Sequence, residues 1–207
     1  MIDQIEWLGH GSFVIQGSPL IYINPWRTGR ANRKADIILV SHEHYEHCSL
    51  ADIERLRDEH TVVIASEKAA REIEPCAVLR PWQSMTVGAA CIKAVPAYSL
   101  QSTLHAPEAG GLGFIISVNM YDIYYAGDTG LIPEMASIRP DIAILPIDGN
   151  GTMTPSEAAQ AAALMRPRWV IPSNWGSPSS RAGRVDAHIL RRELGEQAEV
   201  ALLAQTS

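Results

Sequence analysis

The 207-residue sequence has no long hydrophobic run and no basic segment at its amino terminus. Its longest apolar stretches, such as residues 142–147, fall far short of the roughly 20 residues that a membrane-spanning helix needs. Residues 1–6 also lack the charged and apolar regions of an export signal. These absences predict a cytoplasmic protein with no membrane partner.

Cysteine and positive charge are scarce as well. The three cysteines, Cys48, Cys76 and Cys91, form no Cys-x-x-Cys pair, and their odd number argues against a disulfide framework. Lysine and arginine total 17 against 23 acidic residues, so the formal net charge is −6. Because non-specific nucleic-acid binding needs a positive field, this charge predicts that the protein has no nucleic-acid partner.

The sequence contains no linker, low-complexity tract or internal repeat that would divide it. Its composition, 46% hydrophobic and 19% charged, is that of a globular protein, and a chain of this length can bury most of its apolar surface alone. We therefore expect residues 1–207 to form a single domain. Both a monomer and a homo-oligomer are compatible with these observations.

Short apolar segments dominate the first 40 residues. Residues 2–8, 12–15 and 20–23 are separated by glycine and proline, which predicts an antiparallel meander of strands. Residues 37–40 are continuously apolar, as in strands that are buried on both faces. This fourth strand leads directly into a cluster of histidines.

Strands and helices alternate farther along the chain. Ser49 is a suitable N-cap for a helix over residues 50–58, and residues 154–157 give a strong helix start with Thr, Pro and Glu in the favoured positions. The remaining expected elements are a helix at residues 187–194 and strands at 61–65, 89–95, 113–118, 122–125, 169–172 and 199–203. A change from hairpins to α/β units near Gly127 predicts two halves of one sandwich.

The histidine cluster is the most informative segment of the sequence. His42 and His44 are two residues apart, so in an extended segment both imidazoles point to one side and can bind one metal ion. A turn through Tyr45 would bring Glu46 and His47 to the same place, where they would supply further ligands for zinc, manganese or iron. The alternative is a solvated polar loop, but three histidines and two carboxylates within six positions favour a metal site.

The cluster resembles the H-x-H-x-D-H signature of the metallo-β-lactamase-fold hydrolases. Other motifs of that family follow in the same order along nearly the whole chain. They are the opening turn at residues 7–12, an Asp-Pro-like turn at 23–25, a third histidine at His105, a Gly-Asp-Thr segment at 126–129, and a closing motif at 171–176. The branch that the chain resembles comprises small stand-alone hydrolases related to L-ascorbate-6-phosphate lactonase and N-acylphosphatidylethanolamine phospholipase D.

The resemblance implies an α/β (α+β) fold, a four-layer αββα sandwich with metal ions at one edge. It assigns His42, His44 and His105 to a first ion, Asp128 to a bridging position, and Glu46, His47 and Asn174 to a second ion. It also implies hydrolysis, in which a metal-activated water attacks an ester, lactone or phosphodiester of a small-molecule substrate. Zn²⁺ is the expected ion, with Mn²⁺ and Fe²⁺ as alternatives.

Three positions depart from the family pattern, and all three belong to or support the metal centre. Glu46 replaces an aspartate, Asn174 replaces a histidine, and Asn24 replaces the aspartate of the Asp-Pro turn. An amide oxygen is a poor substitute for imidazole at a zinc site, and only Glu46 and Asp128 bring negative charge to the expected ligands. We therefore expect one firmly bound ion at His42, His44, His105 and Asp128, and a second site that is weak or empty.

These departures also leave a second reading of the chain, a degenerate member that binds a metal or ligand without catalysis. On the catalytic reading, Glu46 is a candidate general base and Asp128 a candidate catalytic ligand. His10, in the opening turn, is a candidate substrate-binding or hydrogen-bonding residue beside the metal pocket. The alternative for His10 is a turn histidine bonded only to backbone.

Overall fold

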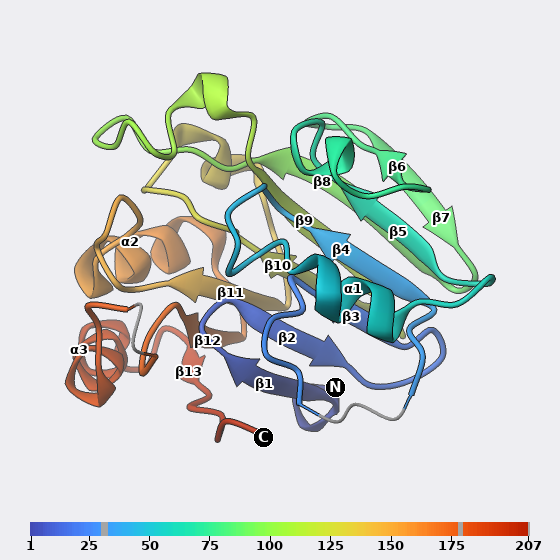
Figure 1. The fold of residues 1–207 in the computed structure, drawn as a ribbon. Helices are drawn as coiled ribbons and strands as arrows, with labels where there is room; N and C mark the ends of the chain where they lie inside the picture. The colour runs from blue at the N-terminus through green and yellow to red at the C-terminus, as the bar shows by residue number, and fades with distance from the viewer. Residues whose placement is uncertain (30–32, 178–179, 207) are drawn as a thin grey trace.

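A computed structural model describes residues 1–29, 33–177 and 180–206 (Figure 1). The first half of the chain forms a six-stranded sheet in sequence order, antiparallel across its first three strands and parallel across the others. Its strands are β1 (Ile5–Gly9), β2 (Ser12–Ile15), β3 (Ile21–Ile23), β4 (Ile37–Val40), β5 (Val62–Ala65) and β6 (Ala77–Val78). The predicted meander is confirmed in β1, β2 and β3.

The second half forms a seven-stranded sheet in the order β13-β12-β11-β10-β9-β8-β7. Strands β7 to β10 are antiparallel, and β10 to β13 are parallel. The strands are β7 (Ser84–Val87), β8 (Ala90–Pro96), β9 (Leu112–Val118), β10 (Tyr121–Tyr125), β11 (Ile142–Pro146), β12 (Trp169–Ser173) and β13 (Glu199–Val200).

Helices cover the outer faces of both sheets, and the two inner faces pack together. Helix α1 (Leu50–Leu56) lies on the first sheet, while α2 (Pro155–Met165) and α3 (Arg184–Leu194) lie against each other beside the second (Figure 1). Strand β4 shows this layering, because Ile38 and Val40 pack in the cluster that contains α1, whereas Ile37 and Leu39 belong to the core between the sheets. The four-layer αββα sandwich is confirmed.

The expected starts of the first two helices are also confirmed. The Ser49 hydroxyl accepts a hydrogen bond from the backbone N–H of Asp52 at the start of α1. At α2, Thr154 and Glu157 form a reciprocal capping box with Pro155 at the first helical position. Short 3₁₀ helices at Ile2–Gln4, Ala69–Arg71, Pro107–Ala109 and Pro133–Ser137 complete the described elements.

Several expected boundaries were wrong. The chain passes from one sheet to the other between β6 and β7, not near Gly127, which marks only the change from antiparallel to parallel pairing within the second sheet. The expected strand at 2–8 begins with a 3₁₀ helix, and the strand at 199–203 ends at Val200. Helix α1 stops at Leu56, and α3 begins three residues earlier than expected, at Arg184.

Strands β6 and β7 had no clear signal in the sequence. Both are edge strands with half-buried or exposed residues, and the alternation in β7 of Ser84 and Thr86 with Met85 and Val87 is only four residues long. Among the described residues, no helix combines the length and the apolar character that crossing a membrane would need.

Candidate metal centre

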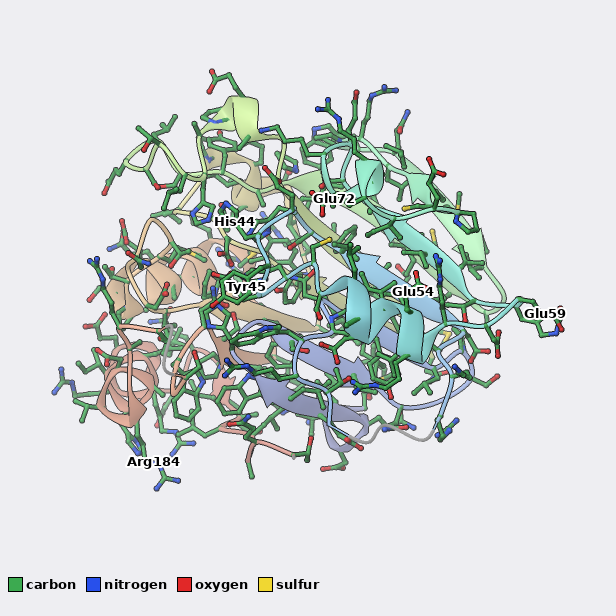
Figure 2. The ribbon with its side chains drawn as sticks, viewed as in Figure 1. His44, Tyr45, Glu54, Glu59, Glu72 and Arg184 are labelled. Carbon is green, nitrogen blue, oxygen red and sulfur yellow. The ribbon has the colours of Figure 1, made fainter. Side chains whose placement is uncertain are left out.

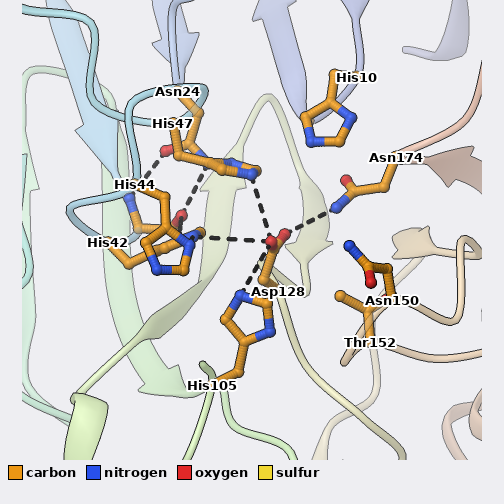
Figure 3. Close-up of polar contacts among 12 residues, drawn as sticks. His10, Asn24, His42, His44, His47, His105, Asp128, Asn150, Thr152 and Asn174 are labelled. Atoms are coloured by element: carbon orange, nitrogen blue, oxygen red, sulfur yellow. Dashed lines mark hydrogen bonds and ion pairs between the residues drawn. The ribbon is translucent and has the colours of Figure 1, made fainter. Parts of the chain in front are cut away.

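The predicted ligands lie on loops that leave the carboxyl ends of strands in both sheets. His42 and His44 follow β4, Asp128 follows β10, and Asn174 directly follows β12 (Figure 3). His105 comes from the loop between β8 and β9. The predicted turn through Tyr45 is present, since the backbone N–H groups of His47 and Cys48 both donate to the His44 carbonyl at 2.8 Å. It returns His47 to the cluster.

Four predicted ligands come together around the Asp128 carboxylate. His42, His44, His105 and Asp128 place one potential ligand atom each within 4.8 Å of one another. The Nε2 atoms of His105 and His42 lie 3.4 and 3.7 Å from Asp128 Oδ2. His42 Nε2 and His44 Nδ1 are 3.1 Å apart. This is the residue set expected for the first ion.

The residues expected at a second ion are arranged differently from the family pattern. Glu46 and His47 form a second group with His10, again with potential ligand atoms within 4.8 Å of one another. Asn174 instead donates a hydrogen bond from Nδ2 to Asp128 Oδ1 at 2.8 Å. Its Oδ1 is buried without a hydrogen-bond partner among the described residues. Position 174 therefore contacts the Asp128 carboxylate.

His105 shows that the first group fits a cation. Its Nδ1 lies 3.1 Å from the carbonyl oxygen of Gly151, which only accepts hydrogen bonds, so Nδ1 carries the proton of the neutral ring. The unprotonated Nε2 is then buried without a hydrogen-bond partner in the described structure and faces the Asp128 carboxylate. Two buried electron-pair donors that face each other are stabilised by a positive ion between them.

The electrostatics of the site agree with this arrangement. Burial alone would raise the pKa of Asp128, but His47, His42 and His105 hold it well below its usual range, so the carboxyl is ionised. The pKa of His42 lies well below 6.5 because the ring is buried and His47 is close. A neutral imidazole and an ionised carboxylate are the protonation states that bind metal.

Two openings lead to the site. One is lined by polar residues that include His10, Glu46, Asp148 and Asn150, and the other by apolar residues that include Ala109 and Leu112, while Leu104 lines both. Asp148 and Asn150, in the loop between β11 and α2, thus contribute to the polar lining of the site. Burial raises the pKa of the Asp148 carboxyl.

Three residues that support the site carried no functional assignment in the sequence. They are Ser41, Tyr125 and Gly151, which contact Asn24, His42 or His105 through hydrogen bonds. Ser41 adjoins the histidine motif and Tyr125 adjoins the Gly-Asp-Thr segment, so proximity to a motif was the available signal. Gly151 contacts His105 through its backbone carbonyl, which every residue type has, so the identity of residue 151 could not have indicated this contact.

Fold and ligands together define a metallo-β-lactamase-type metal centre, and comparisons with known proteins agree. The β-lactamase superfamily domain matches residues 4–174. A UPF0173 metal-dependent hydrolase of Thermococcus kodakarensis is 32% identical over 97% of this chain and 96% of its own length. The chain therefore belongs to the β-lactamase superfamily, among the UPF0173 metal-dependent hydrolases.

Solved structures show the same fold. A candidate metal-dependent hydrolase from Parabacteroides distasonis is 28% identical and superposes with a TM-score of 0.86, covering 98% of this chain and 93% of that one. The metallo hydrolase Igni18 of Ignicoccus hospitalis, at 23% identity, has a TM-score of 0.80 over 98% of this chain and 95% of its own.

His10 provides a pH-dependent prediction. Burial first, and His47 second, lower the pKa of its ring from 6.5 to about 4. Between pH 6.5 and about pH 4, His10 is protonated in the unfolded chain and neutral in the folded chain. The free energy of unfolding therefore falls by up to about 3 kcal/mol as the pH is lowered through this window. We expect His10→Gln to remove that part of the decline in urea denaturation of metal-free protein.

The matched control for this prediction is His188→Gln, because His188 is exposed on α3. Its stability curve from pH 7.5 to pH 4 should parallel that of the wild type. An equally steep loss of stability in the His10→Gln variant would show that burial of His10 does not cause the decline.

Proposed function

We propose that this protein hydrolyses a neutral ester or lactone with one metal ion held by His42, His44, His105 and Asp128. The observation that carries the proposal is the buried Nε2 of His105, which lacks a hydrogen-bond partner in the described structure and faces an ionised carboxylate. When bound, the ion supplies a Lewis acid that lowers the pKa of a water molecule and polarises the substrate oxygen. Zn²⁺ suits three imidazoles and one carboxylate, and Mn²⁺ or Fe²⁺ are the alternatives.

The charge of the pocket supports a neutral substrate. Of the described residues that line the two openings onto the metal cluster, the charged ones are Glu43, Glu46, Asp128 and Asp148, and none is lysine or arginine. Arg184, the first residue of α3, lies at the lower left edge of the molecule in Figure 2, away from His44. A phosphodiester would bring a negative charge into this acidic pocket, where only the bound ion and no basic side chain of the lining could receive it.

Glu46 is the residue that we assign to proton transfer. It lines the pocket beside His10 and is half-buried, so its carboxylate can accept a proton from a water molecule at the metal cluster. We expect Glu46→Gln to lower kcat by about 10²- to 10⁴-fold while the bound metal stays unchanged. Steady-state kinetics and metal analysis of the same preparation measure both quantities.

Glu43→Gln is the matched control, because Glu43 is in the same loop but its carboxylate lies 3.7 Å from the Lys68 ammonium. It should retain most of the activity. If Glu46→Gln lost its metal together with its activity, Glu46 would be a ligand and the assignment to proton transfer would be wrong.

A substrate panel tests the proposed reaction. Esters, lactones and phosphodiesters are assayed with added Zn²⁺, Mn²⁺ or Fe²⁺, with His42→Ala and His44→Ala as blanks. We expect hydrolysis of esters or lactones that a chelator abolishes and added metal restores. Hydrolysis of phosphodiesters alone would refute the argument from pocket charge. A protein that binds metal and turns over none of the panel would support the reading of the chain as a non-catalytic metal-binding member.

A further inference from the structure

Asn24 is the residue whose hydrogen bonds define the surroundings of His47. It follows β3 and is fully buried, with a left-handed backbone at φ 46°. Its Oδ1 accepts a hydrogen bond of 2.8 Å from the backbone N–H of Ser41. Because a backbone N–H can only donate, this bond fixes the orientation of the Asn24 amide, with its oxygen toward Ser41 and its nitrogen on the opposite side.

The Asn24 nitrogen consequently faces His47. Nδ2 lies 2.9 Å from His47 Nδ1, 2.8 Å from Ser41 Oγ and 2.9 Å from the Tyr125 hydroxyl (Figure 3). An amide nitrogen has two hydrogens, enough for two of these three contacts, and no free electron pair, so none of the three neighbours can donate to it. Tyr125 meets this condition, since its own hydroxyl donates to the Gly11 carbonyl at 2.8 Å.

The same condition decides the tautomer of His47. Its Nδ1 faces an N–H donor and is therefore the unprotonated atom, so the ring proton is on Nε2. Nε2 lies 3.3 Å from Asp128 Oδ2 and has no hydrogen-bond partner with regular geometry among the described residues. A ring nitrogen that carries a proton has no electron pair for a metal ion.

His105 shows the opposite arrangement on the other side of Asp128. Both rings direct Nε2 toward Asp128 Oδ2, at 3.3 Å for His47 and 3.4 Å for His105. A carbonyl oxygen contacts Nδ1 of His105, whereas an amide nitrogen contacts Nδ1 of His47. The partner of Nδ1 therefore makes one ring a metal ligand and the other a proton carrier.

We propose that Asn24 holds His47 in the tautomer with its proton on Nε2, which withdraws this ring from a second metal site and makes it an N–H donor toward Asp128. This inference rests on the proposed function only in that one ion occupies the first group. Asn24 is then a positioning residue that limits the protein to one ion. The loss of a histidine ligand at position 174, where this chain has Asn174, is a separate cause of a weak second site, because it concerns a different side chain.

Metal stoichiometry in a set of four proteins separates these two causes. The proteins are the wild type, Asn174→His, Asn24→Asp and the double variant, each loaded with Zn²⁺, freed of excess ion by gel filtration and analysed for metal per chain. An aspartate at position 24 would accept a hydrogen bond from an N–H at His47 Nδ1, which favours the tautomer with its proton on Nδ1 and a free electron pair on Nε2. We expect one equivalent in the wild type and in Asn174→His, and two in the double variant.

Two outcomes of this experiment would overturn the inference. If Asn174→His alone binds two equivalents, the shortage of ligands explains the single site and His47 is already available. If the double variant folds and stays at one equivalent, the tautomer does not limit metal binding. A wild type that binds no metal, or that loses none on His42→Ala substitution, would instead refute the proposed function, so the two failures are distinguishable.

A direct observation of the tautomer keeps the inference testable if the variants do not fold. In ¹⁵N-histidine-labelled wild-type protein loaded with Zn²⁺, two-bond ¹H–¹⁵N correlations report which ring nitrogen bears the proton. We expect His47, assigned by comparison with His47→Gln, to be protonated at Nε2, and His105 to be protonated at Nδ1. A His47 ring protonated at Nδ1 would refute the role of Asn24.

Discussion

His105→Ala is expected to weaken Zn²⁺ binding by more than about 100-fold, because loss of even the outer partners of a metal-ligating histidine costs about 10- to 100-fold. The substitution removes a proposed ligand whose Nδ1 is 3.1 Å from the Gly151 carbonyl oxygen, so that its free electron pair is on Nε2. Only His42, His44 and Asp128 of the first group would then remain to bind the ion. Titration calorimetry of the metal-free protein with Zn²⁺ measures the change in affinity directly.

His188→Ala is the control for this experiment, since His188 is an exposed histidine on α3 and should leave the affinity unchanged. Circular dichroism of the metal-free proteins establishes whether both variants keep the fold. If a folded His105→Ala variant bound Zn²⁺ within about tenfold of the wild type, His105 would not be a ligand of the tightly bound ion.

Gly127→Ala is expected to destabilise the protein by about 3 kcal/mol or more and to reduce metal binding with it. Gly127 immediately precedes Asp128, and its backbone has φ +69°, where any side chain is strained. An added Cβ would also lie 2.6 Å from the Leu112 carbonyl oxygen, which belongs to β9 and cannot move away as a side chain can. Relief of this clash would displace the Asp128 carboxylate.

Gly110→Ala provides a matched control with nearly the same backbone geometry. Its φ is +72°, but a Cβ there would meet nothing within 4 Å. It should therefore lose only about 1 kcal/mol, the cost of the left-handed conformation itself. Urea denaturation measures the free energy of unfolding of both variants. Equal losses would mean that the close approach of the added Cβ to the Leu112 carbonyl does not destabilise the protein.

Much of the fold could be predicted from local patterns. The continuous apolar run at 37–40 predicted the fully buried strand β4, and the residues around Thr154 predicted the capped start of α2. Both predictions were possible because full burial and helix capping each require particular residue types within a few consecutive positions. The edge strand β7 was not predicted, because its alternation of Ser84 and Thr86 with the half-buried Met85 and Val87 covers only four residues. Its place in the second sheet follows from a tight antiparallel turn into β8, where Val87 pairs with Ala90.

The ligands of the expected first ion could also be named from the sequence. His42 and His44 were named from their spacing within the histidine motif, and Asp128 and His105 from motifs in a fixed order, and the structure brings all four together. These assignments rest on which residue types are present. The proximity of His10 to Glu46 and His47 came from the tertiary structure, because it brings together two loops that leave different strands.

The sequence by itself thus determined which side chains reach the metal centre, whereas only the tertiary structure decided which of their atoms are available to a metal ion. The proton on an imidazole follows the group that faces its other nitrogen, and that group comes from a distant segment of the chain. Gly151 contacts His105 across 46 positions and Asn24 contacts His47 across 23. Three-dimensional packing therefore gives two histidines of identical chemistry opposite hydrogen-bond partners on either side of Asp128.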